Sequence, residues 1–172
     1  MVRVAAFLSV VAVCGAVSGC GDPPEPIASV DAFCDGVCTG ANRCDSRVLV
    51  GGCYQDCRTD TRNQSLAFVR PESAAVISAC IKQSDCATIS SGRFEACWDR
   101  AREGGVPSAH AVEFCPAYAT SAFECGYWFS VEDCEADFSV FTDPFLDAAA
   151  ACTQLATCAA KDTCLNNLFG AS

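Results

Sequence analysis

Cysteine offers the most chemistry in this chain, which has 16 cysteines among 172 residues. A thiol can act as a nucleophile, bind a metal, carry a lipid or form a disulfide. Metal binding is disfavoured because no two cysteines have the C-x₂-C spacing of zinc knuckles, and His110 is the only histidine. The C-x₃-C spacings also differ from the C-x-x-C of thiol oxidoreductases. We therefore expect disulfides, with no metal ion and no cofactor.

Motifs of catalysis are missing from the sequence, which has no G-x-S-x-G, phosphate loop, H-E-x-x-H or dinucleotide fingerprint. His110 lies beside a predicted linker, where a histidine is more often exposed than catalytic. Acidic pairs such as Glu132-Asp133 are typical of solvated faces and helix starts. The sequence predicts a protein that is not an enzyme.

Residues 1–19 have the pattern of a signal peptide. Arg3 is the only charge, an apolar run extends from Val4 to Val17, and small residues follow. The run is near the lower limit of the ~20 apolar residues that span a bilayer. We expect it to be removed rather than kept as a transmembrane anchor.

Val17-Ser18-Gly19-Cys20 resembles a bacterial lipobox. The resemblance implies that the Cys20 thiol receives a diacylglycerol, that the chain is cut before Cys20, and that the new amine takes an acyl chain such as palmitate. A cut after Ser18 is the alternative, and it would leave 15 cysteines, one of them unpaired. Lipidation of Cys20 leaves 14 that can all pair, as would a cut after Gly21.

Residues 20–28 form the predicted tether. Pro23, Pro24 and Pro26 favour an extended polyproline spacer of ~3.1 Å per residue. A plain disordered N-terminus would have the same composition.

The mature chain is strongly acidic. Without Arg3 it has 10 basic and 21 acidic side chains. Such a chain gains nothing from neutralising phosphates, so nucleic acid is excluded as a partner. Adsorption to anionic lipid is disfavoured for the same reason, and membrane contact is expected only through a covalent lipid anchor.

The cysteines from Cys34 onward fall into two sets with repeated spacing. Intervals of ten, nine and six residues occur in both, and "ACIKQSDCA" of the first set matches "ACTQLATCA" of the second. These features predict a duplicated module, with copies at residues 29–103 and 109–170 joined by Glu103 to Ser108. The matched intervals are Cys34–Cys44 with Cys115–Cys125, Cys44–Cys53 with Cys125–Cys134, and Cys80–Cys86 with Cys152–Cys158.

Each copy is predicted to be helical. Pro71 and Pro144 suit first helical turns, with Asp143 as an N-cap, and "SVED" from Ser130 resembles a capping box. The expected fold is all-α, with two small disulfide-stapled bundles of three or four short helices. A core of this size rarely supplies more than ~3–5 kcal/mol, so the staples should dominate stability.

The disulfides are expected to pair all fourteen cysteines and to link none across the copies. The second copy has Ala119 and Phe138 at the positions of Cys38 and Cys57. Two cysteines that are missing together are expected to be partners in one disulfide, which predicts the pair Cys38–Cys57. The alternative scheme of Cys34–Cys57 with Cys38–Cys53 also suits a helical hairpin.

A hairpin with its turn near Leu49 further predicts Cys44–Cys53, with Cys125–Cys134 as its counterpart. We also expect Cys80–Cys97 to tie the third and fourth helices of the first copy.

Tyr127, Trp128 and Phe129 lie on a predicted turn between two helices. Aromatic residues on an exposed turn often mark a contact site. The alternative is that the turn folds back over a small core.

With its lipobox, proline-rich tether and "AC-x₅-C" helices, the chain resembles the small cysteine-rich lipoproteins of myxobacteria and related bacteria. The resemblance implies a membrane-anchored protein of the bacterial cell envelope, at the outer membrane because Gly21 rather than Asp follows Cys20. The expected role is structural or an interaction, with an unidentified partner. One alternative is a ligand- or peptide-binding module that uses the aromatic turn. Another is a secreted, non-lipidated factor, in which the Asn63 sequon would matter.

Overall fold

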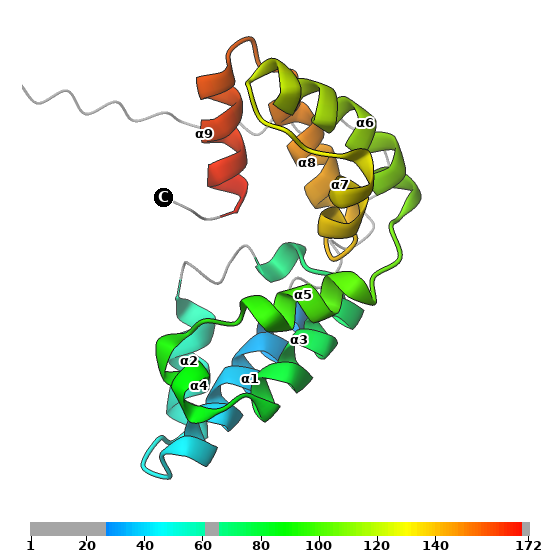
Figure 1. Cartoon of the computed structure of the whole chain (residues 1–172). Helices are drawn as coiled ribbons and strands as arrows, with labels where there is room; N and C mark the ends of the chain where they lie inside the picture. Colours follow the sequence, from blue (N-terminus) through cyan, green and yellow to red (C-terminus); the bar gives the residue numbers. More distant parts are fainter. Residues whose placement is uncertain (1–26, 61–65, 170–172) are drawn as a thin grey trace, which may run out of the picture.

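The computed structural model describes residues 27–60 and 66–169, and their regular secondary structure is helical. Cys20, the predicted signal peptide and the predicted tether lie outside these ranges, as does Asn63. An isolated antiparallel bridge joins Val69 to Phe141. The helices are α1 (Ile27–Cys44), α2 (Val50–Thr59), α3 (Pro71–Gln83), α4 (Cys86–Ser91), α5 (Glu95–Glu103), α6 (Ala109–Glu124), α7 (Val131–Phe138), α8 (Asp143–Thr153) and α9 (Cys158–Leu168) (Figure 1).

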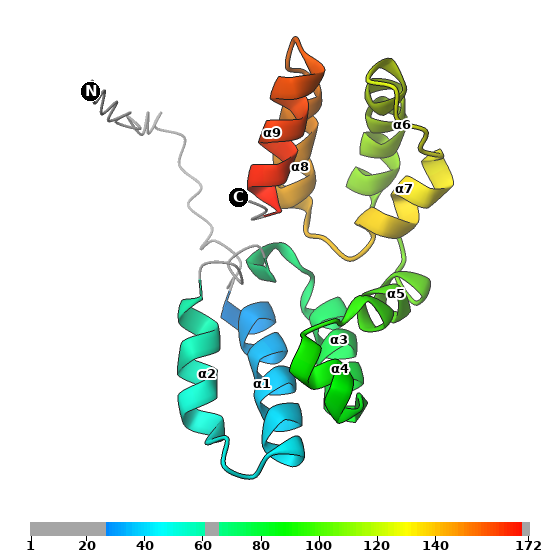
Figure 2. The same cartoon turned by 60° about the vertical axis from the view of Figure 1, so that its left-hand side comes forward.

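The helices form two bundles, which confirms the predicted all-α, disulfide-stapled fold. Helices α1–α5 make the first bundle and α6–α9 the second, and both views show the two stacked with α5 and α7 at the junction (Figures 1 and 2). The connection between α5 and α6 falls at the expected joint. In the first bundle, α4 and α5 take the place that the single helix α9 has in the second.

Helix starts follow from local sequence. Pro71 and Pro144 lie in the first turns of α3 and α8, where the missing N–H of proline costs nothing. The Ser130 hydroxyl accepts the Asp133 N–H at 3.0 Å and caps α7. The prediction of Asp143 as the α8 cap is wrong. The N-cap position belongs to the residue before it, and the Asp143 carboxylate pairs with His110 instead.

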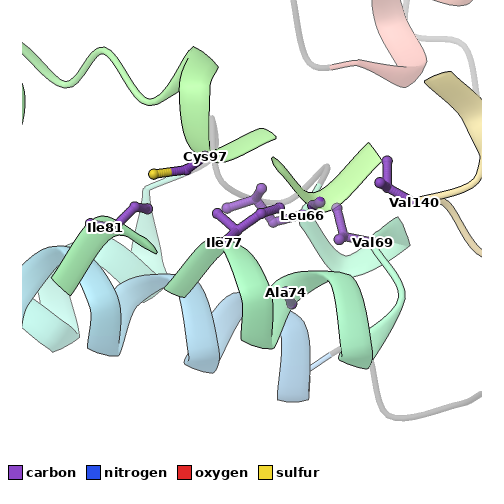
Figure 3. Close-up of a cluster of buried hydrophobic side chains, with 8 residues drawn as sticks. Leu66, Val69, Ala74, Ile77, Ile81, Cys97 and Val140 are labelled. Atoms are coloured by element: carbon purple, nitrogen blue, oxygen red, sulfur yellow. The ribbon is translucent and has the colours of Figure 1, made fainter. Parts of the chain in front are cut away.

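Each bundle has its own core, and the two cores differ in kind. The first is largely aliphatic and includes Ile77 and Ile81 of α3, together with Val140 from the second bundle (Figure 3). The second is built around aromatic rings, with Phe141 stacked on Phe145 at 4.4 Å between centroids. Because Val140 is fully buried in the first core, the bundles share apolar contacts across their junction.

All fourteen cysteines of the described residues are paired, and none of the bridges links the two bundles, as predicted. The predicted pair Cys80–Cys97 is confirmed, with 5.5 Å between Cα atoms. The pairs are Cys34–Cys57, Cys38–Cys53, Cys44–Cys86, Cys80–Cys97, Cys115–Cys134, Cys125–Cys158 and Cys152–Cys164.

The predicted pair Cys38–Cys57 is wrong, and the alternative scheme is the one found. Cys34 and Cys38 lie one turn apart on α1, and Cys53 and Cys57 lie one turn apart on α2. The two helices run antiparallel in a hairpin, so the first cysteine of α1 faces the second cysteine of α2, and the second cysteine of α1 faces the first of α2. The result is a two-step ladder, Cys34–Cys57 and Cys38–Cys53, each with 5.7 Å between Cα atoms.

The predicted pair Cys44–Cys53 is also wrong, because the turn of the hairpin lies earlier than Leu49. Helix α1 continues to Cys44, and the chain reverses from Asp45 onward. Cys44 therefore sits at the tip of the hairpin, where it bonds to Cys86 at the start of α4.

The counterpart prediction, Cys125–Cys134, is wrong for the same reason. Cys125 bonds to Cys158 at the start of α9, as its equivalent does in the first bundle. Cys134 bonds to Cys115 instead. The equivalents of Cys115 and Cys134 in the first bundle belong to two different steps of the ladder. The second bundle therefore has one bridge between α6 and α7 where the first has two between α1 and α2.

Candidate functional site

The aromatic turn between α6 and α7 does not form one continuous surface. Gly126 has a φ of +84°, a conformation that favours glycine, and it reverses the chain. Trp128 then points outward with 87% of its surface exposed. Phe129 turns inward and packs edge-on against Tyr118 at 5.6 Å between ring centroids. The Tyr127 hydroxyl lies 3.4 Å from the Asp162 carboxylate.

A cavity of about 460 Å³ lies at the junction of the two bundles, and it is the strongest candidate site in the described residues. Its walls come from both bundles, including Trp98 of α5 and Tyr118 of α6. Small-molecule sites of ~300–1,000 Å³ occur preferentially at such junctions. The lining residues are Leu66, Val69, Trp98, Arg102, Tyr118, Phe129, Asp137, Phe138, Phe141, Phe145 and Phe169.

One charged pair interrupts the apolar lining. Arg102 of α5 places its Nε 3.3 Å from Asp137 Oδ1 of α7 and its Nη1 3.0 Å from Asp99 Oδ1. The carboxylates of Asp99 and Asp137 thus balance the Arg102 guanidinium, and the cavity wall has no excess positive charge. Burial raises the pKa of Tyr118, as do the negative charges of Asp137 and Asp162, so its phenol stays neutral at physiological pH.

The walls are held by a polar junction between the segments at 68–70 and 140–142. Arg70 donates its backbone N–H to the Val140 carbonyl at 2.8 Å, and Thr142 donates to Phe68 at 2.8 Å. The Arg70 side chain donates from Nε to the Phe141 carbonyl at 2.8 Å and from Nη1 to the linker at 3.1 Å. Backbone bonds in both directions fix the bundles relative to one another, so the cavity is preformed.

His110 lies at the same junction but outside the cavity. Its Nδ1 is 2.9 Å from Asp143 Oδ2, and both side chains are about half exposed. The hydrogen bond to Asp143 raises the pKa of His110, helped by the charge of that carboxylate, and the same bond lowers the pKa of Asp143. Arg70 Nη2 lies 3.8 Å from Asp143 Oδ1, which makes this a small ion-pair cluster.

Of the predicted binding residues, the cavity takes in Phe129 alone, and the binding role of Tyr127 and Trp128 stays a prediction. The sequence analysis missed the remaining walls. One signal could have found part of the site: Phe138, Phe141 and Phe145 recur at helix-like spacing in "DFSVFTDPF". No comparable pattern marks Trp98, which is separated from them by a whole helix in the chain.

No group of three or more His, Cys, Asp and Glu side chains within residues 27–60 and 66–169 is placed to hold a metal ion. In the same part of the chain, every helix is too short or too polar to cross a bilayer. Comparison with known proteins gives no family: neither a protein-family model, nor a curated protein, nor a solved structure matches the chain.

Proposed function

We propose that this protein is a lipid-anchored, disulfide-stapled component of the bacterial cell envelope with a structural or interaction role. The observation that carries the proposal is the closed set of seven bridges, which uses every cysteine from Cys34 onward. Disulfides at this density form and persist in oxidising compartments, which supports an exported protein.

The same set of bridges supports lipidation of Cys20. Each of the fourteen cysteines in the described residues already has a partner in its own bundle, so none is available to Cys20. A mature chain that kept an unmodified Cys20 would carry an unpaired thiol in an oxidising compartment. Thioether attachment of a diacylglycerol removes that thiol, and the lipobox supplies the recognition sequence.

The proposed anchor carries a diacylglyceryl group and an amide-linked acyl chain. A single chain gives only marginal, reversible membrane binding, whereas two signals or more give stable anchoring. The resemblance to myxobacterial lipoproteins and Gly21 after Cys20 favour the outer membrane. The acidic folded body would then stand off the lipid surface on the proline-rich segment.

We assign the folded body no catalytic step. Its cysteines are bound in disulfides and offer no thiolate nucleophile. The His110 imidazole is engaged by Asp143 in an exposed ion pair, which accounts for its raised pKa as a structural contact. A rigid, stapled body at the end of a tether is suited to presenting a surface or holding a ligand. A secreted, non-lipidated factor is the alternative, and membrane fractionation separates the two.

The test is Cys20→Ser in the full-length precursor, with Cys14→Ser as the matched control. Wild type and Cys14→Ser should incorporate labelled palmitate and sediment with membranes, because Cys14 leaves with the signal. Cys20→Ser should take up no label and should keep its signal peptide at that site. Wild-type protein that stays in the soluble fraction and takes up no palmitate would contradict the proposal.

A further inference from the structure

We infer that the cavity at the junction of the two bundles is a binding site for an uncharged, largely apolar small molecule that carries an aromatic ring system. This inference takes from the proposed function only the removal of residues 1–19. It concerns the folded body and holds whether or not Cys20 is lipidated.

The lining sets the shape of the ligand. Aromatic rings face the cavity from α5, α6, α7 and α8 and from the residue that ends α9. Phe141 and Phe145 stack at 4.4 Å between centroids, and Phe169 meets Phe145 edge-on at 5.2 Å. Rings prefer offset-stacked or edge-to-face neighbours, so this wall offers both ring faces and ring edges to another ring.

The charges set the polarity of the ligand. The charge of Arg102 is balanced by Asp99 and Asp137, although its Nε makes no hydrogen bond to Asp137, so the guanidinium attracts an anion only weakly. The chain also has a formal net charge of −10, which repels anions further. A cation would have to compete with Arg102 for Asp137. An uncharged molecule loses none of these interactions, and a single polar group on it could meet the Tyr118 phenol or the charged pair.

The segments outside the described residues offer no large apolar side chain for the cavity. The segments that the structure does not describe read "CGDPPEP" at 20–26, "TRNQS" at 61–65 and "GAS" at 170–172. None of them carries an aromatic or branched aliphatic side chain. A second copy is disfavoured as the occupant because two strongly acidic chains repel one another. We therefore take the occupant to be a separate small molecule, and a chain that begins at residue 21 also lacks the acyl groups proposed for Cys20.

The cavity is also rigid, as a binding site should be. Disulfides tie each helix of the described residues to another helix of its own bundle. The Arg70 side chain donates to the Phe141 carbonyl of the second bundle and to the Val106 carbonyl of the linker. A preformed site costs little conformational entropy on binding.

The probe is N-phenyl-1-naphthylamine, an uncharged dye that fluoresces in apolar sites. It is titrated into residues 21–172, which keep every helix and every disulfide of the described residues. The chain has two tryptophans, Trp98 in the cavity wall and Trp128 on the surface. The substitution Trp128→Phe therefore leaves Trp98 as the single fluorescent tryptophan. We expect saturable binding at one site, with the dye quenching Trp98 by energy transfer.

Two variants and one control locate the dye. Leu66→Trp adds bulk inside the cavity, and Phe169→Ala removes part of the wall. Each should weaken binding by about threefold to tenfold or more, the range expected for a lost aromatic contact. Phe123→Ser removes an exposed ring that does not line this cavity, and it should leave binding unchanged. Circular dichroism and a thiol count check that each variant is folded.

A second dye tests the expectation that the cavity disfavours an anion. The dye 8-anilino-1-naphthalenesulfonate has the same ring system with an added sulfonate, and it should bind at least about tenfold more weakly. Four outcomes would overturn the inference: no saturable binding, equal affinity for the two dyes, unchanged affinity in both folded cavity variants, or a dimer that must dissociate before the dye binds. The last outcome would show that a second copy of the chain occupies the cavity.

Discussion

Replacing Cys38 and Cys57 together by alanine gives the first bundle the cysteine set of the second. The change removes one partner from each step of the ladder and leaves Cys34 and Cys53. Successive steps are one helical turn apart, or ~6 Å along the axis. With 5.7 Å across each bridge, the Cα atoms of Cys34 and Cys53 should be ~8 Å apart. A disulfide requires less than about 7 Å, so the two remaining thiols should stay free.

The cost follows from the loops that the two bridges close. On the chain-entropy account, a separation of 23 residues contributes about 3.4 kcal/mol and one of 15 residues about 3.0 kcal/mol. The bridges are nested and their effects are not fully additive, so the double variant should lose between about 3 and 6 kcal/mol of unfolding free energy. That is a large share of the ~5–15 kcal/mol typical of a whole protein.

The assay combines urea unfolding with alkylation in denaturant without reductant. Cys38→Ala/Cys57→Ala should show two labelled thiols. The matched control is Cys34→Ala/Cys57→Ala, which removes one whole bridge and leaves the Cys38–Cys53 step. It should show no labelled thiol and a smaller loss of stability. A Cys34–Cys53 disulfide in the folded double variant would refute the reasoning, because it would show that α2 can slide along α1 by one helical turn.

Two further predictions concern helix packing and pH. Gly36→Ala should destabilise the protein by about 1–3 kcal/mol, because the new Cβ would lie 3.0 Å from the Cα of Ser78 on α3. Gly52→Ala is the control: its Cβ would have nothing within 4 Å, so it should stabilise α2 by up to about 1 kcal/mol. Chemical denaturation measures both free energies of unfolding, and equal effects would contradict the packing argument. The raised pKa of His110 means that its protonated form stabilises the folded state below about pH 6.5, a contribution lost as pH rises through the folded-state pKa. The urea midpoint of wild type should therefore fall more between about pH 6 and pH 8 than that of His110→Gln, and parallel profiles would show that the pair with Asp143 contributes nothing.

Local chemistry made the helices and several of their starts predictable from the sequence. Proline in the first turn and serine as a cap act over a few residues, so Pro71, Pro144 and Ser130 were placed correctly. The Cys80–Cys97 bridge was predictable because only 17 residues separate the two cysteines, although the short helix α4 lies between α3 and α5. Asp143 was misplaced because its carboxylate is claimed by His110, a residue from another helix.

The ladder between α1 and α2 could not be read from the sequence, because its register depends on where the hairpin turns. A shift of the turn from Leu49 to Asp45 changes the partner of every cysteine in the hairpin. The cavity was out of reach for a similar reason. Its walls run from Leu66 to Phe169 in the chain and are brought together by contacts between the bundles, among them those of Arg70 and Val140.

The intact mass of the mature protein, measured before and after reduction and alkylation, tests the central claim most directly. The account predicts a chain that begins at Cys20 and carries the mass of its lipid, with no alkylated thiol before reduction and fourteen after it. An unlipidated chain that begins at Gly19 and shows fifteen alkylated thiols after reduction would contradict it.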